Sequence, residues 1–337
     1  MMPGGKTRLM NELRISCFLP PSKDAPSYAR LAEELGYDGV FLYDSPAING
    51  DIWMCLGRIA KVTSRISLGT GVAVPSLRHP MVTASAIASI EELAPGRGVY
   101  GFGAGWSARF AMGQKPMRWA DVRRFFVQLR GLLQGEVVEI DGAKCQMIHS
   151  PGFAPPRPIA VPLLAAASGP KGFAVARAVA DGAFVDREVQ PGFARCIQIA
   201  FGVVLDPGED HTSKRVLEAA GPIYVTGFHG MYEMNPTLVD SMPGGPEWRA
   251  RLEAERPAAE RHLALHEGHL VAVSERDQPL IALAGPALLG MHWSGNDEVI
   301  QGHLARTAAA GATEVAMAMA GPDIPRAIKA FARAAGL

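Results

Sequence analysis

Cysteine is scarce in this chain, and the cysteines that are present lie far apart. The 337 residues include four cysteines, Cys17, Cys55, Cys145 and Cys196, and no two of them form a CxxC pair. A disulfide scaffold or a zinc knuckle needs closely spaced cysteines, so both classes are excluded. Isolated thiols of this kind are typical of a reducing compartment, and we expect a cytoplasmic protein.

The chain also lacks a charge excess and a long apolar run. Lysine plus arginine and aspartate plus glutamate both number 33, so the formal net charge is zero. A general nucleic-acid-binding protein carries a basic surplus, and a membrane span needs ~18 consecutive apolar residues. Neither is present, and residues 1–7 show no apolar core of a signal peptide. We therefore expect an enzyme or a small-molecule binder, with neither nucleic acid nor membrane as a partner.

Short apolar strands alternate with amphipathic helices along much of the chain. Strands are expected at 14–19, 40–43, 66–72, 98–103, 159–164, 183–185, 197–205 and 314–319. Helices are expected after the first five strands and after the last, at 28–35, 52–62, 82–93, 122–133, 173–179 and 324–331. This α/β alternation predicts a parallel sheet, and eight strands fit a (β/α)8 TIM barrel. An open doubly wound sheet is the alternative, because periodicity does not show closure.

The second half of the chain departs from this alternation. Residues 137–148, with Asp141-Gly142 at their centre, predict a hairpin. Too few residues separate the sixth and seventh strands for the helix that a parallel crossover normally carries. The stretch at about 206–290 is an insertion rich in proline, glycine, methionine and histidine. We therefore expect an N-terminal tail over 1–13 and one barrel domain over 14–337, with the insertion before its last strand.

Glycines end the fourth predicted strand. Residues 101–105 read GFGAG, and in a barrel the carboxyl end of a strand carries the active site. Glycines there let a planar ligand approach the backbone, although close packing of strand and helix requires them equally. Trp106 follows and either stacks on a ring or plugs the mouth of the barrel. The GxGxxG text at 96–101 precedes its strand and is therefore no dinucleotide fingerprint.

Small residues also follow the fifth strand, at 165–171, and open a helix. The exposed N–H groups and the dipole of a helix N-terminus favour a phosphate there. Ser168 either donates a hydrogen bond to such an anion or caps the helix, and capping is the more common role of such a serine.

A group of histidines lies in the insertion. His262, His266 and His269 occur close together with Glu267, and the spacing of the first two would place both imidazoles on one helical face, as a zinc site requires. However, the HExxH motif is absent, and Gly268 ends the predicted helix. We therefore expect a solvated, charged segment there and no metal site.

Several of these segments together resemble one family. Thr70–Val72, Arg78–Pro80, Thr83–Leu93, Gly101–Gly105 and Ala111–Pro116 occur in the order typical of the bacterial-luciferase-like superfamily of flavin-dependent oxidoreductases. Within it, the chain most resembles the deazaflavin-dependent branch that includes methylenetetrahydromethanopterin reductase. The resemblance continues through Ser168–Lys171 and Ala180–Ala183, so that it covers about 14–186, and it returns at the last strand and helix.

The resemblance implies a (β/α)8 barrel that holds 8-hydroxy-5-deazaflavin (coenzyme F420), or alternatively FMN, at its carboxyl end. It implies a bulge after the third strand, with a non-prolyl cis peptide at Gly71-Val72. It places the ring against Asp44, Thr70, Gly71, Val72, Gly103, Ala104, Gly105 and Trp106. It places the phosphate at Ala166, Ala167, Ser168, Gly169 and Pro170, where an anion site is also expected from the helix start. Members of the family are usually homodimers, which we expect here too.

The chain departs from the family pattern where protons are handled. Asp44-Ser45 replaces the usual Asp-His or His-His pair, and Trp106 replaces the acid that often follows the glycine-rich strand. These losses weaken a sugar-phosphate dehydrogenase mechanism, which needs a base on the substrate hydroxyl. Asp44 and Ser45 remain as catalytic candidates. His79 stands behind them, either as a proton carrier or as an anchor of its loop, and we favour the anchor.

We expect hydride transfer between a bound deazaflavin and a small organic substrate. Apolar strand ends and Met231, Met234 and Met242 of the insertion favour an apolar substrate, although methionine clusters are common in ordinary cores. Two alternatives stay open. One is an FMN-dependent monooxygenase that a partner flavin reductase supplies with reduced flavin, and the other is a flavin-binding protein without catalysis.

Overall fold

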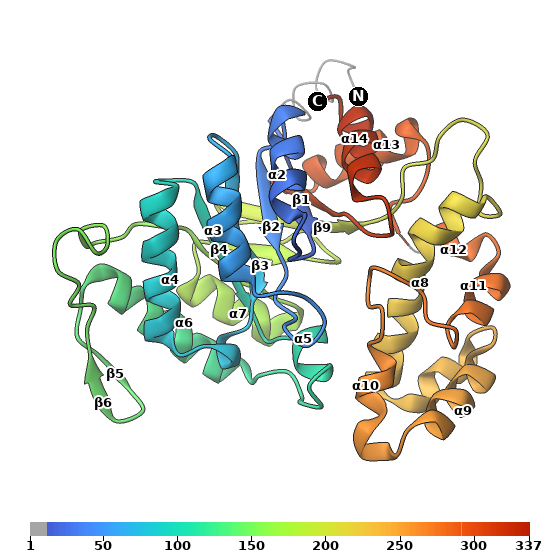
Figure 1. Ribbon diagram of the computed structural model, residues 1–337, viewed down its shortest axis with the longest axis horizontal. Coiled ribbons are helices and arrows are strands. Elements are labelled where there is room, and N and C mark those ends of the chain that lie inside the picture. The colour runs from blue at the N-terminus through green and yellow to red at the C-terminus, as the bar shows by residue number, and fades with distance from the viewer. Residues whose placement is uncertain (1–11, 291) are drawn as a thin grey trace.

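Eight parallel strands close into a barrel in the computed structural model, which describes residues 12–290 and 292–337 (Figure 1). The strands are β1 (Arg14–Leu19), β2 (Gly39–Leu42), β3 (Ser67–Ala73), β4 (Gly98–Gly103), β7 (Leu163–Ala166), β8 (Gly182–Val185), β9 (Arg195–Phe201) and β10 (Glu314–Ala318). β1 pairs with both β2 and β10, which closes the ring. The predicted barrel is confirmed and the open sheet is wrong. Most of the expected tail at 1–13 lies outside the described residues.

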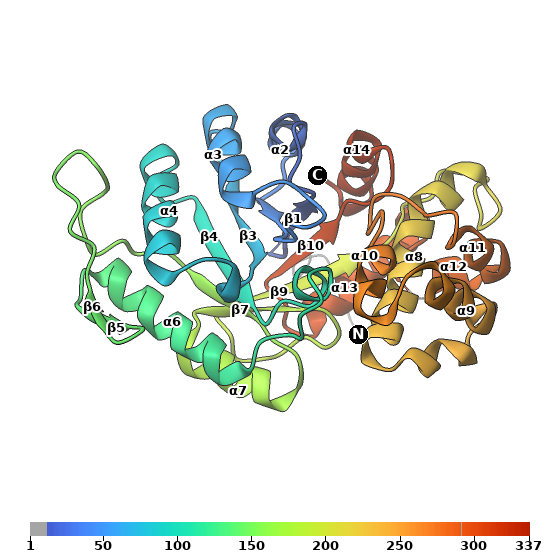
Figure 2. The ribbon, with the colours of Figure 1, turned by 60° about the horizontal axis from the view of Figure 1, so that its bottom comes forward.

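Helices surround the barrel, as Figure 2 shows. They are α2 (Ala25–Glu34), α3 (Ile52–Val62), α4 (Pro80–Leu93), α5 (Ser107–Phe110), α6 (Trp119–Gln134), α7 (Gly169–Val179), α13 (Asp297–Ala309) and α14 (Ile324–Ala335), with a 3-10 turn η1 (Pro75–Leu77). Their apolar stripes face the strands; in α14, Ile324, Ile328 and Phe331 recur at helical spacing and are buried. Within the described ranges, no helix is both long and apolar enough to cross a membrane.

Among the irregular parts of the barrel, two agree with the prediction from the sequence and one differs from it. β5 (Val138–Ile140) and β6 (Ala143–Cys145) form the predicted antiparallel hairpin, with positive φ angles at Asp141 and Gly142. Residues 186–194, all of them described, contain no helix between β8 and β9, as expected. β9 ends at Phe201 and not at residue 205, because the chain leaves the barrel there and Val204 forms an isolated bridge with Gly295.

Aromatic side chains fill the interior of the barrel. Phe18, Phe41 and Phe184 pack against one another with ring centroids 5.3–5.8 Å apart. At the amino end of β10, the buried Glu314 carboxylate lies 2.7 Å from Arg195 Nη2 and accepts a 2.5 Å hydrogen bond from Ser16 Oγ. The interior is therefore a packed core, so within the barrel itself the room for a ligand lies at the carboxyl ends of the strands.

The insertion forms a helical body beside the barrel (Figure 1). Its elements are α8 (Lys214–Met234), η2 (Pro236–Ser241), α9 (Gly245–Glu255), η3 (Ala258–Glu260), α10 (Arg261–Leu265), α11 (Gln278–Ala284) and α12 (Ala287–Gly290). It has its own hydrophobic core, which includes Phe228 and Trp248. Met231 and Met242 pack against this core, and Met234 is exposed. These methionines therefore do not line a substrate pocket, although their presence in the sequence favoured an apolar substrate.

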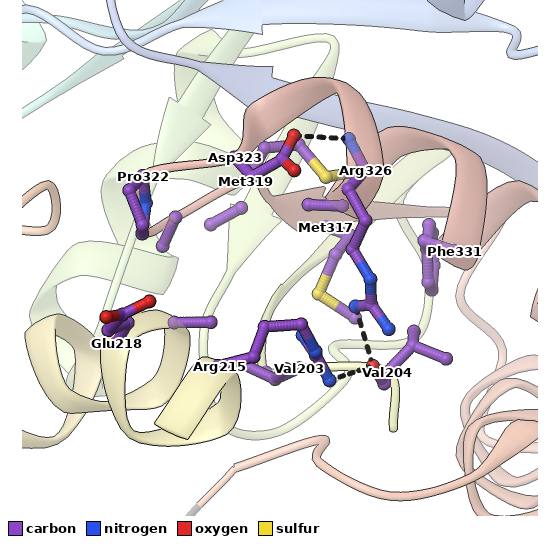
Figure 3. A pocket seen from close by; sticks show the side chains of 15 residues that line it. Val203, Val204, Arg215, Glu218, Met317, Met319, Pro322, Asp323, Arg326 and Phe331 are labelled. Carbon is purple, nitrogen blue, oxygen red and sulfur yellow. Dashed lines mark hydrogen bonds between the residues drawn. The ribbon is translucent and has the colours of Figure 1, made fainter. Parts of the chain in front are cut away.

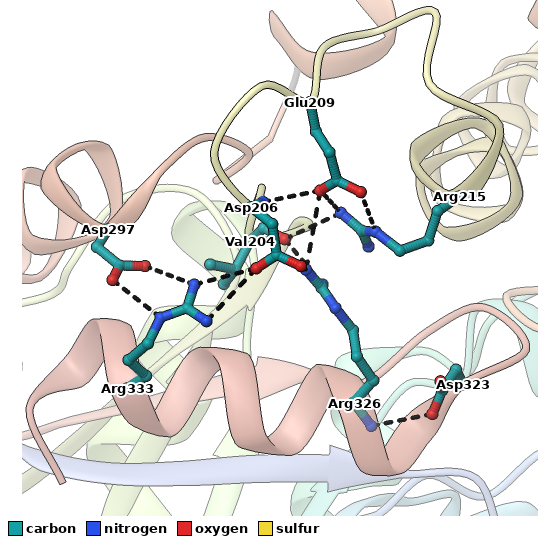
Figure 4. Close-up of polar contacts among 8 residues, drawn as sticks. All are labelled: Val204, Asp206, Glu209, Arg215, Asp297, Asp323, Arg326 and Arg333. Atoms are coloured by element: carbon teal, nitrogen blue, oxygen red, sulfur yellow. Dashed lines mark hydrogen bonds and ion pairs between the residues drawn. The ribbon is translucent and has the colours of Figure 1, made fainter.

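Three arginines tie the start of the insertion to the barrel (Figure 4). Arg326 Nη2, at the start of α14, lies 2.7 Å from Asp206 Oδ2, and Arg215 of α8 pairs with Glu209. Arg333 contacts both Asp206, at 3.4 Å, and Asp297 of α13, at 3.0 Å. A hydrogen bond from Arg326 and the nearby guanidinium charges lower the pKa of Asp206. This network fixes the direction in which α8 leaves the barrel.

Candidate active site

A cavity of about 200 Å³ opens at the carboxyl ends of β2, β3, β4 and β7. It is lined by nine of the predicted site residues, which are Asp44, Ser45, Val72, Gly103, Ala104, Gly105, Trp106, Ala166 and Ser168. Tyr43, Val74, Ser107, Ala108 and Trp119 complete its walls and were not predicted. No motif marks these five residues in the sequence; Ser107 and Ala108 belong to α5 and Trp119 begins α6, so the fold alone brings them to the cavity.

One wall of the cavity is built by a bulge in β3. The register between β3 and β4 shifts between Thr70 and Ala73, and the Gly71-Val72 peptide is cis, as the family resemblance implied. A Cβ atom at Gly71 would lie 2.1 Å from Cε1 of Phe18, so only glycine fits there. Thr70 is fully buried, and its Oγ1 donates to the Gly101 carbonyl at 2.7 Å. Thr70 and Gly71 therefore support the wall, whereas Val72 faces the cavity.

Gly103 keeps the floor of the cavity flat. A Cβ atom at this position would lie 3.0 Å from Val72 Cγ2 and 3.2 Å from Ala166 Cβ, so a side chain would fill the space between them. Trp106 stands at the rim, 50% exposed, with its ring edge-on to Phe110 at 5.5 Å. This shape accepts a planar group, and the exposed indole narrows the entrance without closing it.

Asp44 is the carboxylic acid among the residues that line the cavity. Its Oδ2 accepts a 3.3 Å hydrogen bond from the Val74 N–H. Burial, assisted by the charge of Asp51, raises the pKa of Asp44 to about 6, and the Val74 N–H and Arg78 oppose this rise. Both protonation states are therefore accessible close to neutral pH, which is what a proton carrier requires. Ser45 is buried beside it, and its carbonyl accepts from the N–H groups of Ile48 and Asn49.

His79 lies outside the lining of this cavity. It is exposed, and its Nδ1 accepts a 3.1 Å hydrogen bond from the Met81 N–H at the start of α4. The imidazole thus caps the helix, which agrees with its interpretation as a loop anchor. A catalytic role for His79 stays a prediction.

The expected anion site lies at the start of α7. Ser168 is the exposed N-cap residue, and its hydroxyl makes no capping hydrogen bond. The Ala167 N–H already donates to the Phe184 carbonyl at 3.3 Å, and Pro170 has no N–H. An anion would therefore meet the Ser168 hydroxyl and the N–H groups of Gly169 and Lys171, which belong to the unpaired first turn of the helix.

Ser168 is shared between the cavity and an open groove of about 650 Å³ along α7. Two cationic side chains, Arg177 and Arg187, line this groove together with Asp186 and Glu188. Arg177 donates to the Pro191 carbonyl at 3.1 Å, and Arg187 is exposed. The groove therefore continues the cavity along α7 and carries charged side chains of both signs on its walls.

A further cavity, of about 170 Å³, lies where the insertion joins β9 and β10 (Figure 3). Arg215, Arg326 and the methionines Met317 and Met319 line it. Both guanidinium groups are already paired with carboxylates of the joint, as Figure 4 shows, so they offer little attraction to a ligand anion. We therefore regard this cavity as part of the joint.

The insertion reaches the mouth of the barrel through His262. A Cβ atom at Gly113, in the loop after α5, would lie 3.0 Å from Cε1 of His262. The expectation of a solvated segment at 262–269 is wrong for His266 and His269, which are only 6% and 8% exposed because the segment folds onto α8. Glu267 is exposed, as expected. Burial, with His229 and His266 nearby, lowers the pKa of His269 to about 3.

Comparison with known sequences identifies one family model and several relatives that match part of the chain. The sequence model of the family described as luciferase-like monooxygenase matches residues 7–198, more than half of the chain. The chain is 36% identical over 185 residues to 5,10-methylenetetrahydromethanopterin reductase of Methanolobus tindarius, which covers 52% of this chain and 54% of the relative. It is 37% identical over 177 residues to F420-dependent glucose-6-phosphate dehydrogenase of Beutenbergia cavernae, covering 48% and 51%. The matches thus span about half the length of these curated relatives.

Two solved structures share the fold over nearly the whole chain. Coenzyme F420-dependent tetrahydromethanopterin reductase from Methanopyrus kandleri has a TM-score of 0.66 at 20% identity, covering 96% of this chain and 98% of that one. An F420-dependent secondary alcohol dehydrogenase in complex with an F420-acetone adduct has a TM-score of 0.65 at 18% identity, with the same coverage. At this identity the likeness concerns the fold alone, and it extends well beyond residue 198.

Proposed function

Because the chain belongs to the luciferase-like monooxygenase family, we propose that it is an oxidoreductase that transfers hydride between bound coenzyme F420 and a small organic substrate. The observation that carries the proposal is the flat cavity between Val72 and Ala166, which a side chain at Gly103 would fill and which Asp44 borders. The relative that is 37% identical is named as F420-dependent, which favours F420 over FMN.

The chain offers a position for each part of the cofactor. The bulge at Val72 and the bare backbone of Gly103 would hold the ring, with Asp44 at its edge. The Ser168 hydroxyl and the first-turn amides of α7 would hold the phosphate, and the groove beside them has room for the rest of the tail. When bound, F420 supplies a carbon centre that accepts or donates a hydride.

The side chains around the cavity would orient the substrate and handle its proton. Val74, Ala108, Trp106 and Trp119 give the remaining walls a mainly apolar character, which suits an apolar substrate. Asp44 would hold or release the proton that accompanies hydride transfer, because its pKa of about 6 makes both forms available. Trp106 at the rim would limit the access of water.

The proposal is tested by titrating the purified protein with F420 and with FMN in separate experiments and following the absorbance of each ring. We expect F420 to bind and Gly103→Val to abolish binding. Gly230→Ala is the matched control, because a Cβ atom at Gly230 meets nothing within 4 Å. Tight binding of FMN without binding of F420 would refute the proposal in favour of the monooxygenase. Binding of F420 without turnover across a panel of alcohols, aldehydes and unsaturated substrates would favour a non-catalytic binding protein.

A homodimer and a cytoplasmic location belong to the same proposal. They derive from the family resemblance and from the isolated thiols, of which Cys17, Cys55 and Cys196 are buried and unpaired. Sedimentation of the purified protein tests the first, and fractionation of the source cells tests the second.

A further inference from the structure

Three histidines meet inside the helical insertion, away from the cavity at the mouth of the barrel. His229 comes from α8, and His266 and His269 follow α10. One ring nitrogen from each histidine lies within 4.8 Å of those of the other two. The three side chains are nearly inaccessible, with exposures of 1%, 6% and 8%. Their ring centroids are 5.6–6.2 Å apart, so the imidazoles surround a common point.

Four ring nitrogens of this cluster lack hydrogen-bond partners. Nδ1 of His229, His266 and His269 is buried and unpaired, and so is Nε2 of His229. A buried polar atom without a partner destabilises the folded state, and native proteins contain only a few such atoms. Each of the three histidines has an unpaired Nδ1, and the rings surround one point, so a single shared partner could satisfy all three.

Carboxylates stand behind two of the imidazoles. His266 Nε2 lies 3.1 Å from Glu233 Oε1, and His229 Nε2 lies 3.6 Å from Asp277 Oδ2. Asp277 is itself held by 2.7 Å hydrogen bonds from Trp248 Nε1 and Ser274 Oγ. A carboxylate behind a histidine orients the ring and strengthens its other nitrogen as a metal ligand.

We propose that His229, His266 and His269 bind one divalent transition-metal ion, Zn²⁺ in the first instance, which fixes α8 to the segment between α10 and α11. Three imidazoles suit zinc and exclude magnesium and calcium, which prefer oxygen ligands. Glu233 and Asp277 offset the charge of the ion. The neighbouring cation, Arg276, is already paired with Glu255 at 2.7 Å, so its repulsion of a metal is reduced.

The spacing of histidines in the sequence pointed to a different set, in which His262 stood in the place of His229. The i, i+4 pair would have been His262 and His266, but His262 turns toward Gly113. The third ligand, His229, lies far earlier in the chain, on α8, and only the packing of α8 against the loop after α10 brings it in. His262 therefore provides a matched control for the cluster.

The test uses the full chain, stripped with a chelator and titrated with Zn²⁺ alone by calorimetry, with metal content measured after dialysis. We expect one zinc per chain, and visible d–d absorption typical of four-coordinate cobalt when Co²⁺ replaces it. With free zinc at 100 times its Kd, the equilibrium constant for unfolding should fall about 100-fold. None of these readouts depends on F420, so this proposal and the proposed function fail separately.

Variants decide whether the cluster is the site. We expect His269→Asn to remove the stoichiometric zinc and His262→Asn to retain it. Glu233→Gln keeps all three ligands and should weaken zinc binding about 10–100-fold, which tests the site even if a ligand variant fails to fold. The proposal is overturned if the folded wild-type protein takes up no zinc, or if His262→Asn and Glu233→Gln affect binding equally.

Discussion

Replacing Asp44 with asparagine should stabilise the protein at neutral pH while removing its proton carrier. The folded protein raises the pKa of this carboxyl from 3.8 to about 6, chiefly by burial. Each pKa unit corresponds to about 1.4 kcal/mol, so ionised Asp44 destabilises the folded state by about 3 kcal/mol once the pH exceeds 6. Well below pH 3.8 the carboxyl is protonated in both the folded and the unfolded state, and the difference vanishes.

Stability therefore falls as the pH rises from 3.8 to about 6, and Asp44→Asn removes this loss. Urea denaturation at pH 3.5 and at pH 8 measures the effect: we expect the variant to match the wild type at about pH 3.5 and to gain up to about 3 kcal/mol at about pH 8. Asp141→Asn is the control, because Asp141 is exposed at the tip of the β5–β6 hairpin. A gain that is equal at both pH values, or no gain at all, would refute the reasoning.

Three further changes test other parts of the structure. Gly71→Ala places a Cβ atom 2.1 Å from Cε1 of Phe18, so we expect a loss of at least 1–3 kcal/mol by thermal unfolding, and an unchanged Tm would contradict this packing. Glu314→Ala leaves Arg195 buried without its partner and should cost about 3–5 kcal/mol by urea denaturation, whereas a cost below about 1 kcal/mol would show that the pair is unimportant. Ser168→Ala should weaken F420 binding about tenfold in the absorbance titration without changing Tm, and an unchanged affinity would remove Ser168 from the phosphate site.

Most of the barrel was predictable because its signals are local. β1, β4 and α3 begin and end where apolar spacing and punctuating residues place them, and the Asp141-Gly142 turn marks its hairpin. Closure of the sheet was suggested by the count of strands, but only the pairing of β1 with β10 demonstrates it. Apart from the short helix expected before Gly268, the helices of the insertion were missed, because they bury their faces against one another and the composition there resembles that of a loop.

Site residues that lie in family motifs were predictable, whereas residues that only packing brings to the cavity were not. Val72, Gly103 and Ser168 were expected, and they line the cavity. Thr70 was expected beside the ring but is buried behind the wall, because its hydroxyl is bonded to β4. Trp119 lies far along the chain from the glycine-rich segment and carries no motif, so only the fold brings it to the cavity.

A crystal structure of the protein grown with F420 tests the central claim most directly. The account predicts the ring in contact with Val72 and Gly103, Asp44 at its edge, and the phosphate at Ser168 and the start of α7. A ring bound elsewhere, or a phosphate held by Arg215 and Arg326 at the joint with the insertion, would contradict it.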